Sequence, residues 1–151
     1  MIPCVNYLAA IVSAGVFLSV ANPASAQGIE HFAVLNGGNE VSPGGQAAAG
    51  DPDGSGAASV LVRGDGLCFS ILVQRIGRPI MAHIHDAEAG SNGPIRVVLT
   101  LPGSGNPGTS SGCVGGIGAG LLTRLRNTPN QFYVNVHTAA FPAGAVRGQL
   151  F

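Results

Sequence analysis

Short segments of alternating apolar and polar residues, separated by turns rich in Gly and Pro, dominate this sequence. Such alternation places every second side chain on one face of a strand, and the 24 Gly and 10 Pro residues supply the turns. We therefore predict an all-β, antiparallel sandwich or barrel of about seven to eight strands. The predicted strands are 31–35, 57–62, 67–74, 81–86, 95–99, 132–138 and 145–151.

The segments between these strands carry three further signals. Leu121, Leu122 and Leu125 recur at helical spacing before Pro129, which predicts a short helix over 119–127. The stretch "RGDG" predicts a hairpin with Asp65-Gly66 in the turn, because that pair tolerates positive φ. Two Gly-rich segments are long for loops, and we expect them to be ordered only in part. They are residues 36–56 and 102–120.

The first 26 residues have the pattern of a secretory signal peptide. An apolar run from Tyr7 to Val20 is too short to span a membrane comfortably, and the small residues Ala24 to Ala26 fit a cleavage site. We therefore predict a signal peptide over 1–26 and one domain over 27–151, exported to the periplasm or secreted. No second apolar stretch is long enough to cross a membrane, so we expect no membrane span after cleavage.

The charge composition limits the classes of partner that the protein can bind, and the cysteines indicate the redox compartment in which it folds. Seven basic residues, all Arg, balance seven acidic ones, and this sparse charge argues against nucleic acid, which needs a dense cationic surface. Cys68 and Cys113 are the two cysteines beyond the leader. In an exported domain they predict a disulfide, and the alternative is two buried free thiols.

Three of the four histidines share a strand face with other polar residues. His83 and His85 lie opposite Ile84, while His137 lies opposite Val134 and Val136. Each strand can therefore give its apolar side to the core. The polar residues left on the other face are His83, His85, Asn135, His137 and Arg147.

Two interpretations of this polar face stay open. Imidazole suits copper and zinc, and two histidines from one strand with a third from its neighbour form a three-nitrogen site. The candidate metal ligands are His83, His85 and His137, with Glu40, Asn135 and Arg147 around them. The alternative is a hydrogen-bond network in which the histidines, Glu40 and Arg147 tie strands and loops together.

Several motifs, arriving in order, resemble those of the CHRD domain, the module repeated in the extracellular protein chordin and found alone in exported bacterial proteins. They are "LNGGNEVSP", "GSGAASVLV", "LCFSI", "AHIHDAEAGSNGPIRVVL", "SGCVGG" and "YVNVHTAAFPAGAVRGQL". Two departures are "EVSP" where the family usually has "EVPP", and "HIHD" where Gly often follows the second His. The resemblance implies an immunoglobulin-like or Greek-key sandwich and supports pairing Cys68 with Cys113. It implies no established activity, because fold alone does not set function.

A weaker similarity is to copper/zinc superoxide dismutases, which also place a His-x-His pair on one strand and a further His on another. Here the zinc subsite is absent, because His31 is the one remaining histidine outside the three candidates. Neither a nucleophile elbow nor a zinc-protease helix is present, so the motifs favour a protein without catalytic residues. We therefore expect a binding or structural domain whose partner, a protein or small ligand outside the cytoplasm, is unknown. The alternative is a mononuclear copper- or zinc-binding protein.

Overall fold

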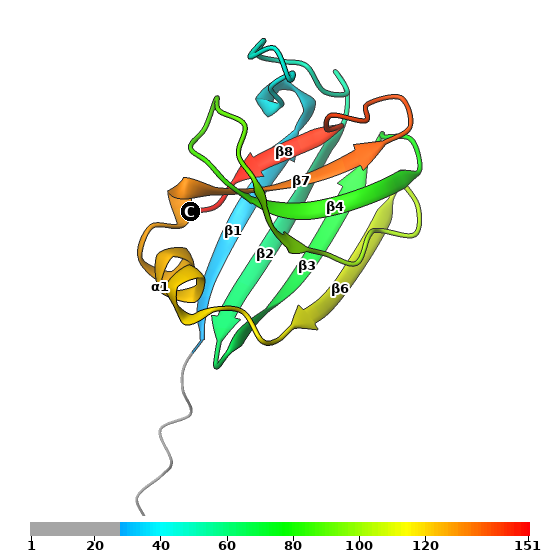
Figure 1. The fold of residues 1–151 in the computed structure, drawn as a ribbon. Coiled ribbons are helices and arrows are strands. Elements are labelled where there is room, and N and C mark those ends of the chain that lie inside the picture. The colour runs from blue at the N-terminus through cyan, green and yellow to red at the C-terminus, as the bar shows by residue number, and fades with distance from the viewer. Residues whose placement is uncertain (1–27) are drawn as a thin grey trace, which may run out of the picture.

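The computed structural model describes residues 28–151, so the predicted signal peptide lies outside the described residues. The described chain is an antiparallel β-sandwich with one short α-helix, as the alternation predicted (Figure 1). The strands are β1 (Ile29–Asn36), β2 (Ser55–Arg63), β3 (Gly66–Gln74), β4 (Pro79–Asp86), β5 (Ile95–Val98), β6 (Gly108–Val114), β7 (Phe132–Thr138) and β8 (Val146–Gln149). The helices are α1 (Ala119–Asn127) and two single 3₁₀ turns, η1 (Gly37–Asn39) and η2 (Pro129–Gln131).

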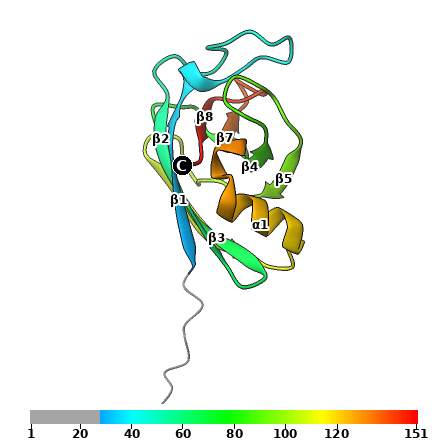
Figure 2. The ribbon, with the colours of Figure 1, turned by 90° about the vertical axis from the view of Figure 1, so that its left-hand side faces the viewer.

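The strands run in the order β5-β4-β7-β8-β1-β2-β3-β6 and form two layers of four (Figure 2). The layers join where β8 meets β1, through the pair Asn36 and Arg147 and the backbone bonds between Phe32 and Phe151. Gly148 allows this close crossing, because a Cβ atom there would lie 2.4 Å from the carbonyl oxygen of Val34. The two layers therefore belong to one sheet that folds back on itself.

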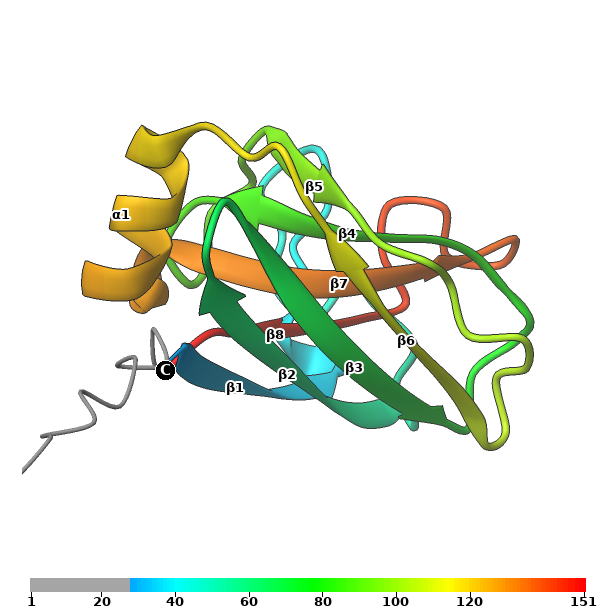
Figure 3. The ribbon, with the colours of Figure 1, turned by 90° about the horizontal axis from the view of Figure 1, so that it is seen from below.

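The core lies between the layers and consists of the inward apolar residues of every long strand. Val134 and Val136 of β7 are fully buried there, as the alternation predicted. Helix α1 packs over one end of the sandwich through Leu122 and Leu125 (Figure 3). It ends before Pro129, so the predicted helix over 119–127 is confirmed.

Two local predictions need correction. Strand β6 lies inside the Gly-rich segment 102–120, which we had expected to be a partly ordered loop. The hairpin between β2 and β3 is present, but Arg63 pairs with Gly66, so the turn is Gly64-Asp65. Gly64, with a φ of 54°, holds the left-handed conformation that this two-residue turn needs.

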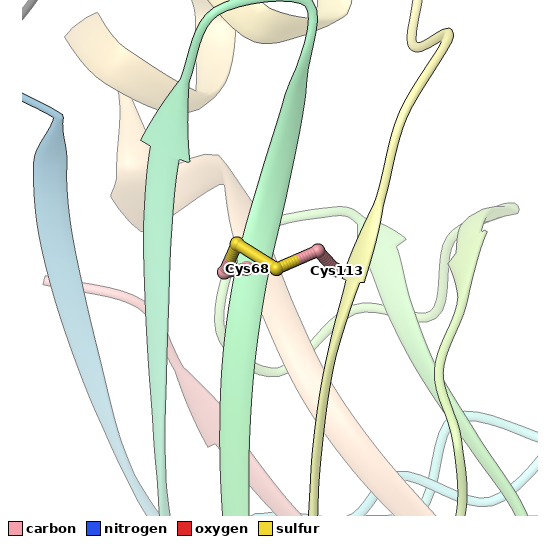
Figure 4. Close-up of a disulfide and its surroundings, with 2 residues drawn as sticks. All are labelled: Cys68 and Cys113. Atoms are coloured by element: carbon pink, nitrogen blue, oxygen red, sulfur yellow. A yellow bond between two sulfur atoms is a disulfide. The ribbon is translucent and has the colours of Figure 1, made fainter.

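A disulfide joins Cys68 of β3 to Cys113 of β6, as predicted (Figure 4). The two residues face each other directly in the strand register. Their neighbours Ser70 and Leu72, which share a face of β3 with Cys68, are exposed. The disulfide therefore lies on the outer surface of its layer, on the side of the molecule away from the core.

Three loops lie along the upper side of the sandwich as it is drawn in Figure 1. They are residues 37–54, 87–94 and 139–145. Hydrogen bonds tie them together, since the Asn92 amide donates to the carbonyls of Val41 and Ser42, and the Asp51 amide donates to Ala145. These loops cover the polar face of β4, β7 and β8. None of the helices in residues 28–151 is long and apolar enough to cross a membrane.

Candidate metal site

Strands β4 and β7 place the candidate histidines on the face that the loops cover. In the antiparallel register His83 lies opposite Asn135 and His85 lies opposite Tyr133. Opposed residues on an antiparallel pair share a face, so all four side chains point away from the core. His137 is two residues beyond Asn135 and therefore points the same way.

The three histidine rings converge. His83 Nδ1 lies 3.2 Å from His137 Nε2, and the rings of His83 and His85 have centroids 5.5 Å apart. One potential ligand atom from each histidine lies within 4.8 Å of the other two. Two nitrogens on one tetrahedral ion, each about 2 Å from it, would be roughly 3.3 Å apart. The pair from His83 and His137 already has this spacing.

Backbone carbonyls fix the tautomers of two of these rings. His85 Nδ1 donates to the carbonyl of Gly93 at 2.8 Å, and His137 Nδ1 donates to that of Pro142 at 3.0 Å. A neutral imidazole carries one N–H, so the Nε2 of each ring carries a lone pair instead of a proton. The Nε2 of His85 is buried and has no hydrogen-bond partner. A buried polar atom left without a partner is costly and calls for an explanation.

Burial keeps the three rings neutral. It lowers the pKa of His83 to about 4, with further lowering from His137 and His85. Burial likewise lowers the pKa of His85 and His137, against opposing hydrogen bonds to the two carbonyls. Metal ligation requires the neutral imidazole. The folded protein therefore holds all three donors in the form that binds a metal at neutral pH.

An aromatic and a cationic side chain support the His85 ring from behind. Tyr133 stacks on it with ring centroids 4.7 Å apart and planes 5° from parallel. The guanidinium of Arg147 covers the other face of Tyr133, with Cζ 3.3 Å from the ring centroid. Arg147 also donates to the carbonyls of Glu88 and Ser91 in the loop that contains Gly93. This stack fixes both the ring of His85 and the loop that orients it.

Glu40 lies deep beneath the same loops. It is 2% exposed, and its Oε1 has no hydrogen-bond partner. Burial raises its pKa to about 7, although the charge of Arg147 opposes the rise. Gly144 packs directly on the carboxyl group, since a Cβ there would lie 2.2 Å from Oε1. Glu40 is therefore a packed carboxyl group at the base of the loops, and its burial favours the protonated form.

A pocket of about 340 Å³ between the three loops opens onto His85 and His137, while His83 does not line it. His85 and His137 line its floor together with Tyr133 and Asn135. Its remaining lining residues are Val41, Pro43, Asn92, Gly93, Pro142 and Ala143. The rings of His85 and His137 are thus buried but reachable from solvent through this opening.

The sequence model of the CHRD domain matches residues 31–150, which include both strands of the site and all three covering loops. The chain belongs to the CHRD domain family. No curated protein and no solved structure matches it. The CHRD match covers the motifs that carry the histidines, Glu40 and Arg147, so the whole arrangement lies within the domain.

The structure brings some of the site residues predicted from the sequence together and places others apart from them. The three histidines come together, and the side-chain amide of Asn135 lies 3.1 Å from His137 Nε2. Glu40 and Arg147 lie beneath the loops, but in residues 28–151 neither makes a hydrogen bond with one of the three histidines. The alternative network is present in part: His137 contacts His83 and Asn135, and Asn135 also forms a hydrogen bond with Glu40 that lowers the pKa of Glu40 against the effect of burial.

Three further residues of the site had no assigned role. Tyr133 stacks on His85, while the carbonyls of Gly93 and Pro142 orient the rings. The parity of β7 already placed Tyr133 on the polar face. A carbonyl acceptor gives no signal in a sequence, because every residue has one.

Two other features, a buried histidine and a surface hollow, lie outside this site. His31 of β1 is buried, on the same side of the strand as Ala33 and Leu35, and it does not belong to the group of three histidines. A hollow of about 700 Å³ lies on the outer surface of β1, β2, β3 and β6, lined by residues such as Phe32, Leu72 and Ser110. None of the residues that line it is titratable, so it offers no acid, base or metal ligand.

Proposed function

We propose that this CHRD domain is a non-catalytic binding domain whose ligand is one transition-metal ion held by His83, His85 and His137. The convergence of three buried imidazoles, with a ligand atom from each within 4.8 Å of the others, is the observation that carries the proposal. The unpartnered Nε2 of His85 supports it, because a metal ion would satisfy this buried lone pair. Small movements of the rings would bring all three nitrogens to bonding distance.

The donor set favours copper or zinc. Imidazole nitrogen suits both ions, whereas calcium and magnesium prefer carboxylate and carbonyl oxygen. Cys68 and Cys113 are bonded to each other and so supply no thiolate. We therefore infer copper or zinc as the bound ion, with no second metal subsite.

Calorimetric titration of the purified protein with Zn²⁺ and Cu²⁺ tests this proposal. We expect one ion per chain and a higher melting temperature, because a ligand bound only by the folded state stabilises it. His137→Ala should abolish most of the binding, while His31→Asn, which removes a histidine outside the group, should leave it intact. Equal binding by wild type and His137→Ala would overturn the proposal.

We also infer that the protein works outside the cytoplasm. Membership of a family found in extracellular proteins and the disulfide between Cys68 and Cys113 support this location. The predicted signal peptide over 1–26 agrees with it and places the mature N-terminus at Gln27. Intact-mass measurement of exported protein tests the inference, and a chain that retains Met1 to Ala26 would contradict it.

A further inference from the structure

We propose that a small anion, reaching the site through the pocket between the loops, occupies the fourth coordination position of the bound metal. This inference rests on the proposed metal site and adds its ligand. The pocket places an opening beside His85 and His137, lined by residues of all three loops. The number of protein donors, the charge that they leave and the shape of the opening support this inference.

The protein supplies three donors and leaves one position open. Within residues 28–151 the group that converges on one point contains His83, His85 and His137, and no Cys, Asp or Glu joins it. Closed structural zinc sites have four protein ligands, whereas sites with three keep a position for water or an exogenous molecule. The site therefore has the pattern of one that exchanges a ligand.

The donors leave the charge of the metal uncompensated. Three neutral imidazoles around a divalent ion keep its full double positive charge. Among the described residues Glu40 is the one buried carboxyl, and it lies beside the guanidinium of Arg147, which is itself buried. An anion in the fourth position would offset the charge in a partly dehydrated site, where electrostatic attraction is stronger than in water.

The pocket has a suitable size and lining. Its volume of about 340 Å³ is that of roughly ten water molecules at about 30 Å³ each. Val41, Pro43, Pro142 and Ala143 give it apolar walls, and Asn92 and Asn135 supply polar groups. Pro43, Pro142 and Ala143 are exposed and mark the rim. A small anion of a few atoms fits this space, and the rim is accessible from solvent.

Azide binding to the Cu²⁺-loaded protein tests the proposal. We expect a saturable one-to-one change in the copper absorption and electron paramagnetic resonance spectra. Ala143→Trp adds a large side chain at the rim of the pocket and should raise the Kd for azide at least about tenfold, with copper stoichiometry retained. Ala140→Trp is the matched control, because Ala140 is exposed in the same loop but does not line the pocket.

The outcomes separate this inference from the proposed function. If copper binds and azide leaves the spectra of wild type unchanged, the fourth position is closed and the inference is wrong. If Ala143→Trp and Ala140→Trp bind azide equally well, the route through the pocket is wrong. Failure of wild type to bind copper at all would overturn the proposed function, and the inference with it.

Discussion

Nδ1 of His83 faces Nε2 of His137 at 3.2 Å across strands β4 and β7. Because His137 Nδ1 donates to Pro142, its Nε2 must accept, so the proton between the two rings belongs to His83. A metal that replaces this proton at Nδ1 requires the His83 ring to carry its proton on Nε2 instead. Metal binding therefore exchanges the tautomer of one histidine.

We predict that zinc changes the tautomer of His83 alone. The metal-free His83 should be protonated on Nδ1 and the zinc-bound ring on Nε2, while His85 and His137 keep Nδ1–H in both states because carbonyls hold them. Long-range ¹H–¹⁵N NMR spectra of the imidazoles distinguish these forms. Unchanged nitrogen shifts for His83 on addition of zinc would contradict the prediction.

We predict that Arg147 cannot be replaced without loss of stability, even by Lys. Its planar guanidinium stacks on Tyr133 and donates to the carbonyls of Glu88 and Ser91, which an ammonium group cannot reproduce. We expect Arg147→Lys to lower the free energy of unfolding by about 2–4 kcal/mol, since buried charged hydrogen bonds are lost. Urea unfolding measures this. Arg126→Lys, at a half-buried arginine whose hydrogen bond to the carbonyl of Gly64 is exposed, should change stability by less than about 0.5 kcal/mol.

The strand alternation predicted most of the fold but missed β6, and the packing explains why. The inward positions of β6 are Gly108, Ser110, Gly112 and Val114. The ring of Phe69 on β3 fills the space above Gly112. A Cβ at Gly112 would already lie 3.3 Å from that ring. With Val114 at its end as the one large apolar residue on its inward face, the strand has no apolar period to detect.

The sequence predicted which strand residues share the face of the candidate site, but it did not predict the loops that cover this face. Parity alone placed His83, His85 and His137 on one polar face. The burial of that face depends on loops without a periodic pattern, held by contacts between distant residues such as Asn92 and Val41. The low pKa of the histidines and the unpartnered Nε2 follow from this cover, so the sequence could not indicate them.

The disulfide should stabilise the sandwich without affecting the metal site. It links residues 45 apart in the sequence, and closing a loop of that order contributes at most about 4 kcal/mol in the chain-entropy model. Replacing both Cys68 and Cys113 by Ala should cost about 2–4 kcal/mol in urea unfolding and leave zinc affinity unchanged, because the sulfurs lie on the other layer. A large loss of zinc affinity in this folded variant would show that the two layers are coupled.

Glu40 should make the metal-free protein less stable as the pH rises. Its pKa of about 7 in the folded state exceeds the ordinary 4.5, so between these values the folded protein binds more protons than the unfolded chain. By linkage this contribution is fully present below about pH 4.5 and is lost as the pH rises through 7, for a total of about 3 kcal/mol.

The variant Glu40→Gln tests this prediction, because Gln resembles the protonated acid and should not lose this contribution. We therefore expect the stability of Glu40→Gln relative to wild type to increase by about 3 kcal/mol from pH 4.5 to 8 in urea unfolding; the histidines, common to both proteins, cancel in this difference. A difference that stays constant with pH would show that Glu40 is ionised in the folded protein without cost.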